Sequence, residues 1–100
     1  AQDAPEGWFD DVLVWCKEVR QGVDEITKLV LENKIFIKRT LGVCPVKSDE
    51  AIDWGYTGPL LRASGVNLDL RKVAPYYGYD GLEFDVPVGA NGDIYDRYLV

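Results

Sequence analysis

The first third of the chain carries apolar residues at helical spacing. From residue 8 to residue 30 they recur at alternating intervals of four and three positions, which places their side chains on one face of an α-helix. The members of this stripe are Trp8, Val12, Trp15, Val19, Val23, Ile26 and Val30. A second apolar edge is formed by Phe9, Leu13 and Cys16. The pattern predicts one long amphipathic helix, or two in series, that packs against partners on more than one side.

Local signals bound this helix. Asp3, followed three residues later by a glutamate, resembles a capping box, and Pro5 suits a first helical turn. We therefore expect the helix to begin between Pro5 and Trp8. If it continues to residue 32, its length is on the order of 37 Å at about 1.5 Å per residue. Gly22 is a candidate break, because an interior glycine costs about 1 kcal/mol relative to alanine.

The pattern changes after residue 32. Residues 33–40 mix apolar and basic side chains and predict a short helical or irregular connector. Residues 41–46 are compatible with a short strand, and residues 82–86 alternate apolar and acidic side chains, as a strand does. Glycine and proline recur every few positions between residues 55 and 92, which predicts a region rich in loops.

Two further helix starts are marked by capping residues. Ser48 precedes a brief helical pattern that ends at Gly55, since serine satisfies free amides and glycine tolerates a left-handed terminus. Asp93 caps a new pattern whose helical periodicity has only begun at Val100, the last residue of the sequence.

These signals predict an α+β fold: a long bundle helix, a loop-rich region with short strands, and the start of a second helix. We expect residues 1–100 to form a single segment with a helical part at 1–40, a loop and short-strand part at 41–92, and a truncated helix start at 93–100. A long helix with few partners, a helix that has barely begun and a first residue that is not methionine together predict an internal piece of a larger protein.

Charge narrows the classes of partner. The net charge is −6 and the isoelectric point is about 4.5. Nucleic acids and anionic bilayers bind surfaces with excess lysine and arginine, so we expect neither as a partner. The longest uninterrupted apolar run, residues 12–16, is far shorter than the roughly 20 residues of a membrane-spanning helix, so no membrane span is expected.

Few residue types are available for catalysis. The chain has no histidine, which removes the commonest general base and metal ligand. Cys16 and Cys44 are expected to be reduced thiols, and without a paired cysteine motif they predict no metal site within this chain. The carboxylates near glycine and proline are better interpreted as turn and helix caps than as an acid and base pair.

Residues 61–72 hold the most suggestive polar group. Arg62, Asp69 and Arg71 are set among apolar residues and turns, with Lys72 as a third cation. A guanidinium group matches a carboxylate in a bidentate geometry. We interpret these residues as forming a structural ion pair, within the fold or with a neighbouring subunit, in preference to a ligand contact.

The motifs of residues 58–99 resemble the D-type, quinone-site large subunit of respiratory complex I, the NADH:quinone oxidoreductase family. They are GPLLRASGV at residues 58–66, DLRK at 69–72, PY at 75–76, YD at 79–80, FDVPVG at 84–89, GD at 92–93 and YDRYL at 95–99. Upstream, residues 3–8, 24–25, 33, 35 and 39–40 also fit. The family is similar to the large subunit of nickel-iron hydrogenases, so the resemblance implies part of that fold.

The resemblance implies a scaffold role in a parent subunit that helps to form the quinone-reduction site, without independent catalysis by this segment. The family's quinone-holding residues precede the segment, so we assign no catalytic, cofactor-binding or metal-binding residue. Residues that match the family motif are candidates for fixing loops or an interface: Arg62, Ser64, Gly65, Asp69 and Arg71.

The implied surroundings follow from the same resemblance. This segment binds no cofactor, while the parent complex uses quinone, with NAD and iron–sulfur clusters in neighbouring subunits. Its partners are the rest of the parent subunit and other subunits of the peripheral arm. The implied location is peripheral, on the cytoplasmic face of a bacterial inner membrane or the matrix face of the mitochondrial inner membrane.

Two alternatives remain open at this point. One is a fragment of a membrane-bound nickel-iron hydrogenase-type large subunit, which cysteine pairs in flanking sequence would establish. The other is a free-standing acidic module that binds a partner protein through the face of Trp8, Trp15 and Val19.

Overall fold

The computed structural model describes residues 3–100. The chain divides into two compact units, Ala1–Phe36 and Ile37–Val100. Among residues 3–100, no helix is both long enough and apolar enough to cross a membrane.

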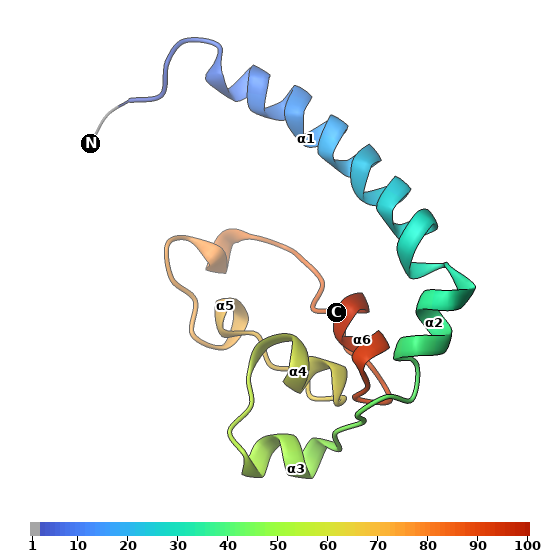
Figure 1. The fold of residues 1–100 in the computed structure, drawn as a ribbon. Coiled ribbons are helices and arrows are strands. Elements are labelled where there is room, and N and C mark those ends of the chain that lie inside the picture. The colour runs from blue at the N-terminus through green and yellow to red at the C-terminus, as the bar shows by residue number, and fades with distance from the viewer. Residues whose placement is uncertain (1–2) are drawn as a thin grey trace. The chain divides into compact units, whose positions relative to one another are not determined.

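One long helix dominates the first unit (Figure 1). Helix α1 spans Trp8–Ile26 and leads directly into a π-helical turn, η1, at Thr27–Leu31. The predicted long helix is therefore confirmed, and Gly22 lies within α1 without interrupting it. The predicted capping box is wrong, because the N-cap is Gly7 in a left-handed conformation (φ 80°) and no side chain caps the helix.

The π-helical turn has a local hydrogen-bond signature. The amide of Glu32 donates to the carbonyl of Thr27 at 2.9 Å, a bond that spans five residues. The hydroxyl of Thr27 donates to the carbonyl of Val23, also at 2.9 Å. A threonine that bonds back to the preceding turn perturbs a helix and often bends it. The back-bonded threonine is the residue at which the widened turn begins.

Helix α1 buries none of its residues. Its apolar residues are partly to largely solvent-exposed, with Leu13 and Trp15 each 60% exposed. The predicted apolar stripe is thus present on a regular helix, but residues of its own unit do not cover it.

Short helices joined by loops form the second unit. Helix α2 spans Lys34–Thr40 across the boundary between the units, and α3 spans Ser48–Asp53. The remaining elements are α4 at Gly58–Ala63, α5 at Leu70–Val73, the 3₁₀ turn η2 at Tyr79–Gly81, and α6 at Ile94–Leu99. Helix α4 packs against α3 and α6, and α5 packs against η2 (Figure 1).

The strands expected in this unit are wrong, because no residue from 3 to 100 lies in a β-strand. At residues 41–46, Cys44 adopts a left-handed conformation (φ 52°) and Pro45 lacks an amide hydrogen, so the extended run cannot continue. At residues 82–86 the alternation is real, since Phe84 and Val86 are half-buried while Glu83 and Asp85 are exposed. No neighbouring backbone pairs with this stretch, and the chain is built of helices and loops rather than α+β.

Other local predictions are confirmed. Helix α2 realises the helical form of the connector, and Asn33 caps it by accepting a hydrogen bond from the amide of Ile35 at 2.8 Å. Helix α3 begins at Ser48 and ends before Gly55, which is left-handed (φ 68°), but the capping role expected of Ser48 is wrong, because Lys47 is the N-cap and no side chain caps the helix. Asp93 is the N-cap of α6. The division of residues 1–100 into a single segment with parts at 1–40, 41–92 and 93–100 stays a prediction.

The interior of the second unit is unusually polar. Its buried apolar residues are Ala51, Leu61 and Ala63, of which two are small. The buried polar residues are Thr40, Ser64, Asp69, Asp93 and Asp96. Because buried polar groups cost free energy unless they are hydrogen-bonded, the partners of these side chains decide how the unit is held together.

Candidate functional site

Two clusters of polar side chains organise residues 37–100. The first, here called the polar junction, comprises Gly89, Gly92, Asp93, Asp96 and Arg97. It joins the end of α4, the loop after α2 and the start of α6 through hydrogen bonds to the backbone.

Asp93 is completely buried at the centre of the junction. Its Oδ2 accepts a hydrogen bond from the amide of Gly42 at 2.7 Å, and its Oδ1 accepts one from the amide of Asp96 at 2.9 Å. The second bond caps α6, and the first ties that helix to a loop 51 residues earlier. Bonds between backbone amides and a carboxylate are charge-assisted and therefore strong.

Asp96 and Arg97 extend the junction on either side of the helix start. Asp96 is buried, and its Oδ2 accepts hydrogen bonds from the amides of Ala90 at 2.9 Å and Asn91 at 2.6 Å. The Nη2 of Arg97 donates to the carbonyls of Cys44 at 2.7 Å and Gly92 at 2.8 Å. Both side chains thus fix loop backbone to α6.

The two glycines permit a close approach of backbones. The amide of Gly92 donates to the carbonyl of Ala63 at 2.9 Å, and the amide of Gly89 donates to the carbonyl of Arg62 at 2.9 Å. A Cβ at Gly89 would lie 2.7 Å from the carbonyl oxygen of Ala63. A Cβ at Gly92 would fall on the carbonyl oxygen of Val46, and Gly92 is also left-handed (φ 65°). No other residue fits either position without moving the backbone.

Ser64 and Gly65, two of the predicted motif residues, end helix α4 beside this junction. The hydroxyl of Ser64 donates to the carbonyl of Leu60 at 3.0 Å, and Ser64 is buried. Gly65 adopts a left-handed conformation (φ 92°), which turns the chain after the helix. Their contacts are with the backbone of this unit.

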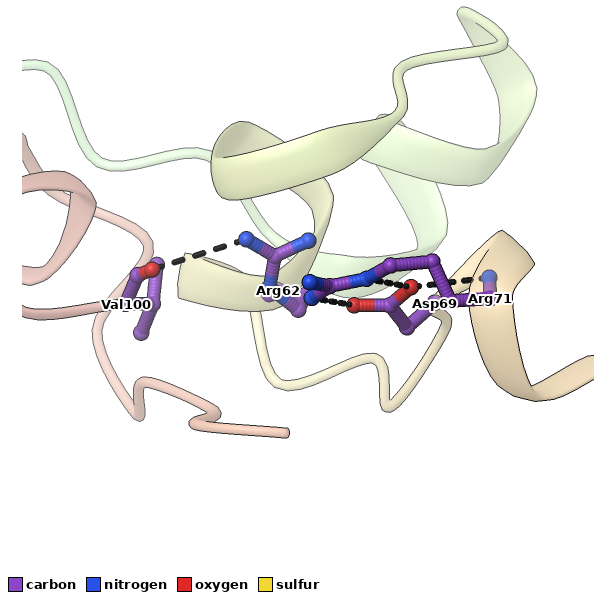
Figure 2. Close-up of polar contacts among 4 residues, drawn as sticks. All are labelled: Arg62, Asp69, Arg71 and Val100. Atoms are coloured by element: carbon purple, nitrogen blue, oxygen red, sulfur yellow. Dashed lines mark hydrogen bonds and ion pairs between the residues drawn. The ribbon is translucent and has the colours of Figure 1, made fainter. Parts of the chain in front are cut away.

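The second cluster contains the other predicted motif residues, Arg62, Asp69 and Arg71 (Figure 2). Asp69 is the N-cap of α5, where its Oδ1 accepts a hydrogen bond from the amide of Arg71 at 2.9 Å. The side chain of Arg71 also forms a fork on the same carboxylate: Nε donates to Oδ1 at 2.9 Å and Nη2 donates to Oδ2 at 2.6 Å. The two residues meet because Asp69 is the N-cap, in an extended conformation, and its carboxylate reaches the first turn of α5, where Arg71 lies.

The ion pair shifts the titration of both partners. Side-chain hydrogen bonds from Arg71 hold the pKa of Asp69 well below its ordinary value of 3.8, and the amide of Arg71 and the charge of Arg62 lower it further. Hydrogen bonding to Asp69 raises the pKa of Arg71. Asp69 is therefore an anion at neutral pH.

Aromatic rings cover the outer side of this pair. The guanidinium carbon of Arg71 lies 4.6 Å from the ring centre of Phe84 and 5.8 Å from that of Tyr79. The Nζ of Lys72 lies 4.8 Å from the ring centre of Phe84. These distances are typical of cation–π contacts. They explain why Phe84 is half-buried in a segment without strand partners.

Arg62 lies beside the pair but does not join it. Its Nη2 donates to the carbonyl of Val100 at 3.5 Å, and its Nε is buried without a hydrogen-bond partner. An open hollow of about 320 Å³ adjoins all three charged residues. Its lining, here called the arginine hollow, comprises Thr57, Gly58, Arg62, Leu68, Asp69, Leu70, Arg71 and Tyr76.

Sequence reasoning found the second cluster and missed most of the first. It identified the cap at Asp93, but it assigned no role to Gly89, Asp96 or Arg97. The signal that could have found them is the pair of glycines three apart, followed at once by an aspartate and then by another aspartate three residues later. That spacing is typical of a loop that packs tightly before a capped helix.

Comparison with known proteins decides the family. Residues 1–100, the whole chain, match the family described as respiratory-chain NADH dehydrogenase, 49 Kd subunit. The chain belongs to this family. The resemblance noted in the motifs of residues 58–99 is therefore confirmed.

Curated relatives of the 49 Kd subunit family carry the names of NADH-quinone oxidoreductase subunits. The chain is 72% identical over its full length to the C/D-type subunit of Bdellovibrio bacteriovorus, of which it covers 18%. It is 48% identical to the D-type subunit of Wolbachia sp. subsp. Brugia malayi and 50% identical to that of Paramagnetospirillum magneticum, and it covers 26% of each. The chain thus spans about a fifth to a quarter of the relatives that it matches. The hydrogenase-type and free-standing alternatives find no support in these matches.

Proposed function

We propose that this chain is a scaffold segment of the subunit that helps to form the quinone-reduction site of an NADH-quinone oxidoreductase. The observation that carries the proposal is the match of all 100 residues to the 49 Kd subunit family. On this proposal the parent complex is an oxidoreductase, while the segment supplies position and support rather than a reacting group.

The geometry of the two clusters supports a structural role. The carboxylates of Asp93 and Asp96 each accept two backbone hydrogen bonds, and that of Asp69 is bound by Arg71. Carboxylates bound in this way hold loop and helix backbone in place. We propose that Ser64 and Gly65 fix the turn after α4, and that Asp69 and Arg71 fix the start of α5.

The cofactors of the proposed complex would be held elsewhere. Within residues 3–100, no group of three or more cysteine, aspartate and glutamate side chains gathers closely enough to hold a metal ion. The residues of this segment therefore do not fit an iron–sulfur cluster, which takes four ligands, usually cysteine thiolates. We assign quinone, NAD and iron–sulfur binding to the rest of the parent protein and to its neighbours.

The surroundings of the segment are proposed in the same way. Its partners would be the remaining part of the parent subunit and other subunits of the peripheral arm. The uncovered apolar face of α1 supports this, because a large exposed apolar surface is typical of a surface that packs on other polypeptide. A hydrogenase-large-subunit-like fold of the parent, and a peripheral location on the cytoplasmic or matrix face of a membrane, belong to the same proposal.

The proposal is tested by separating assembly from turnover. In a complete complex that includes this segment, Asp93→Ala removes the carboxylate that binds Gly42 and caps α6. We expect the amount of assembled complex to fall at least tenfold, since losing a helix cap and leaving an amide unpaired together cost roughly 2–4 kcal/mol. NADH:quinone turnover per assembled complex should stay unchanged.

The matched control is Asp53→Ala, which removes an exposed carboxylate at the end of α3. It should leave both the amount of assembled complex and the turnover per complex unchanged. Normal assembly of Asp93→Ala with a loss of turnover per complex would reject the scaffold role in favour of direct participation in the reaction.

A further inference from the structure

The residues that line the arginine hollow carry a net charge of one positive unit. Its charged lining residues are Arg62, Asp69 and Arg71, two guanidinium groups and one carboxylate. This excess stands out in a chain whose net charge is −6. The described part of the chain therefore leaves one of the two arginines without a carboxylate.

Asp69 cannot serve both arginines. Its Oδ1 accepts from the amide and the Nε of Arg71, and its Oδ2 accepts from the Nη2 of Arg71. Turning the carboxylate toward Arg62 would break the bidentate fork and the cap of α5 together. Figure 2 shows the guanidinium of Arg62 between the carbonyl of Val100 and this closed pair.

Arg62 is the unsatisfied member. A guanidinium has five N–H donors, and the hydrogen bond that Arg62 makes in residues 3–100 is the 3.5 Å contact with the carbonyl of Val100. Its Nε is buried without a partner. A partly buried cation in this state is destabilising unless an acceptor from elsewhere completes it.

The hollow has the shape and chemistry for a carboxylate. It is partly open, has a volume of about 320 Å³, and is lined by Leu68 and Leu70 beside the charged groups. A planar carboxylate matches the guanidinium fork, and one carboxylate balances the one excess charge.

We propose that the arginine hollow receives an aspartate or glutamate side chain from polypeptide outside residues 1–100 of the same subunit, and that Arg62 is its ion-pair partner. The inference rests on the proposed function, because a longer parent protein supplies the carboxylate. The chain covers 18–26% of the length of its relatives, so most of each relative is polypeptide outside the matching segment. A carboxylate of the same folded subunit is held in place beside Arg62, whereas a free anion would have to bind from solution.

Charge reversal in a complete complex tests the contact. Arg62→Glu is introduced into the full-length parent protein, and each aspartate and glutamate outside the segment is changed to lysine, one at a time, in that background. We expect Arg62→Glu to lower assembled complex about tenfold or more, as breaking a buried charge pair does. One reversed carboxylate should restore it to within about twofold. Lys47→Glu, an exposed charge reversal in the same unit, should have no effect.

The glutamate of Arg62→Glu also repels Asp69 and can disturb the fold by itself. A second series of variants separates that effect from loss of the ion pair. Arg62→Met removes the cation without adding an anion, and the partner carboxylate changed to methionine should then restore assembly, since an apolar pair can replace a buried ion pair. The same position should rescue in both series.

Three outcomes would overturn the proposal. If no single carboxylate rescues either series, or if Arg62→Glu is as harmless as Lys47→Glu, the hollow has no protein carboxylate. If acetate added to the wild-type complex protects it and no carboxylate change affects Arg62, the occupant is a free anion instead. Rescue of a reversed pair together with an effect of Asp93→Ala on turnover alone would keep this contact and reject the scaffold role.

Discussion

The two units of the chain use apolar and polar side chains in opposite ways. In Ala1–Phe36, helix α1 carries large apolar side chains such as Trp15 and buries none of its residues. In Ile37–Val100, the buried positions include three carboxylates, Asp69, Asp93 and Asp96, and each is bound by hydrogen bonds from its own unit. The first unit is regular and uncovered, whereas the second is irregular and binds its buried carboxylates from within.

The difference shows two routes to a defined backbone. A long helix is specified by local periodicity, but most helical stability in proteins comes from packing of the apolar face against something else. Loops have no periodicity to specify them, so the second unit relies on hydrogen bonds of fixed geometry and on glycines that let backbones touch. We expect substitutions to act strongly in the second unit and weakly in the first.

The largest effect is expected at the polar junction. Gly92→Ala places a Cβ on the carbonyl oxygen of Val46 and forces alanine into a left-handed conformation. We expect the free energy of unfolding of residues 37–100 to fall by roughly 2–5 kcal/mol, from overpacking and backbone strain together. Amide hydrogen exchange at Gly42 and Asp96, which both donate to Asp93, measures the loss.

Gly78→Ala is the matched control for this substitution. Gly78 is also left-handed (φ 83°), but a Cβ there meets nothing within 4 Å. It should cost only the backbone strain of about 1–2 kcal/mol. Equal losses at the two glycines would mean that the close approach of Gly92 to Val46 does not stabilise the unit.

An intermediate effect, which depends on pH, is expected at the ion pair. Because the pKa of Asp69 is lowered in the folded state, the folded chain binds a proton less readily than the unfolded chain does. The ion pair therefore stabilises the fold above the ordinary pKa of 3.8 and is lost as the pH falls below it. Asp69→Asn should be less stable than wild type near neutral pH, and the gap should close in acid.

Urea midpoints measured at about pH 7 and about pH 3 should show the gap narrowing. Asp53→Asn, which changes an exposed carboxylate, should follow wild type at both values. A gap between Asp69→Asn and wild type that stays constant with pH would show that the carboxylate acts through shape rather than through its charge.

The smallest effect on folding is expected in α1. Trp15→Gln replaces a side chain that is 60% exposed, so the stability of residues 37–100 should change by less than about 0.5 kcal/mol. Its effect should instead be on association, because Trp15 contributes to the uncovered apolar face. Sedimentation of the 100-residue chain should show less self-association for Trp15→Gln than for Glu18→Gln, an exposed polar change on the same helix. A large loss of stability from Trp15→Gln would contradict the contrast between the units.

The sequence predicted the features of the fold that neighbouring residues decide. The stripe from Trp8 to Val30 predicted α1, and Asp93 predicted the start of α6, because helix periodicity and caps depend on residues within four positions. The strands failed because a strand requires a partner from elsewhere in the chain. The alternation around Phe84 instead reflects packing of its ring on Arg71 and Lys72.

The same distinction holds for the candidate site. The pair of Asp69 and Arg71 could be anticipated, since the carboxylate of an N-cap aspartate lies over the first turn of the helix that follows. The hydrogen bonds from Gly42 to Asp93 and from Gly92 to Ala63 join positions distant in the sequence. A local sequence pattern does not predict them. Arg62 is an intermediate case. The sequence showed that its guanidinium needs a partner, but the carboxylate that we propose lies outside residues 1–100.

The bond between the Gly42 amide and Asp93 also sets an order for protein synthesis. Since a ribosome adds residues from the N-terminus, the amide of Gly42 is made 51 positions before the carboxylate that receives it. Closing a loop of that length costs chain entropy that only the finished contact repays. Residues 37–100 should therefore stay open on the ribosome until residue 97 has emerged, while the hydrogen bonds of α1, which join residues four apart, can form earlier.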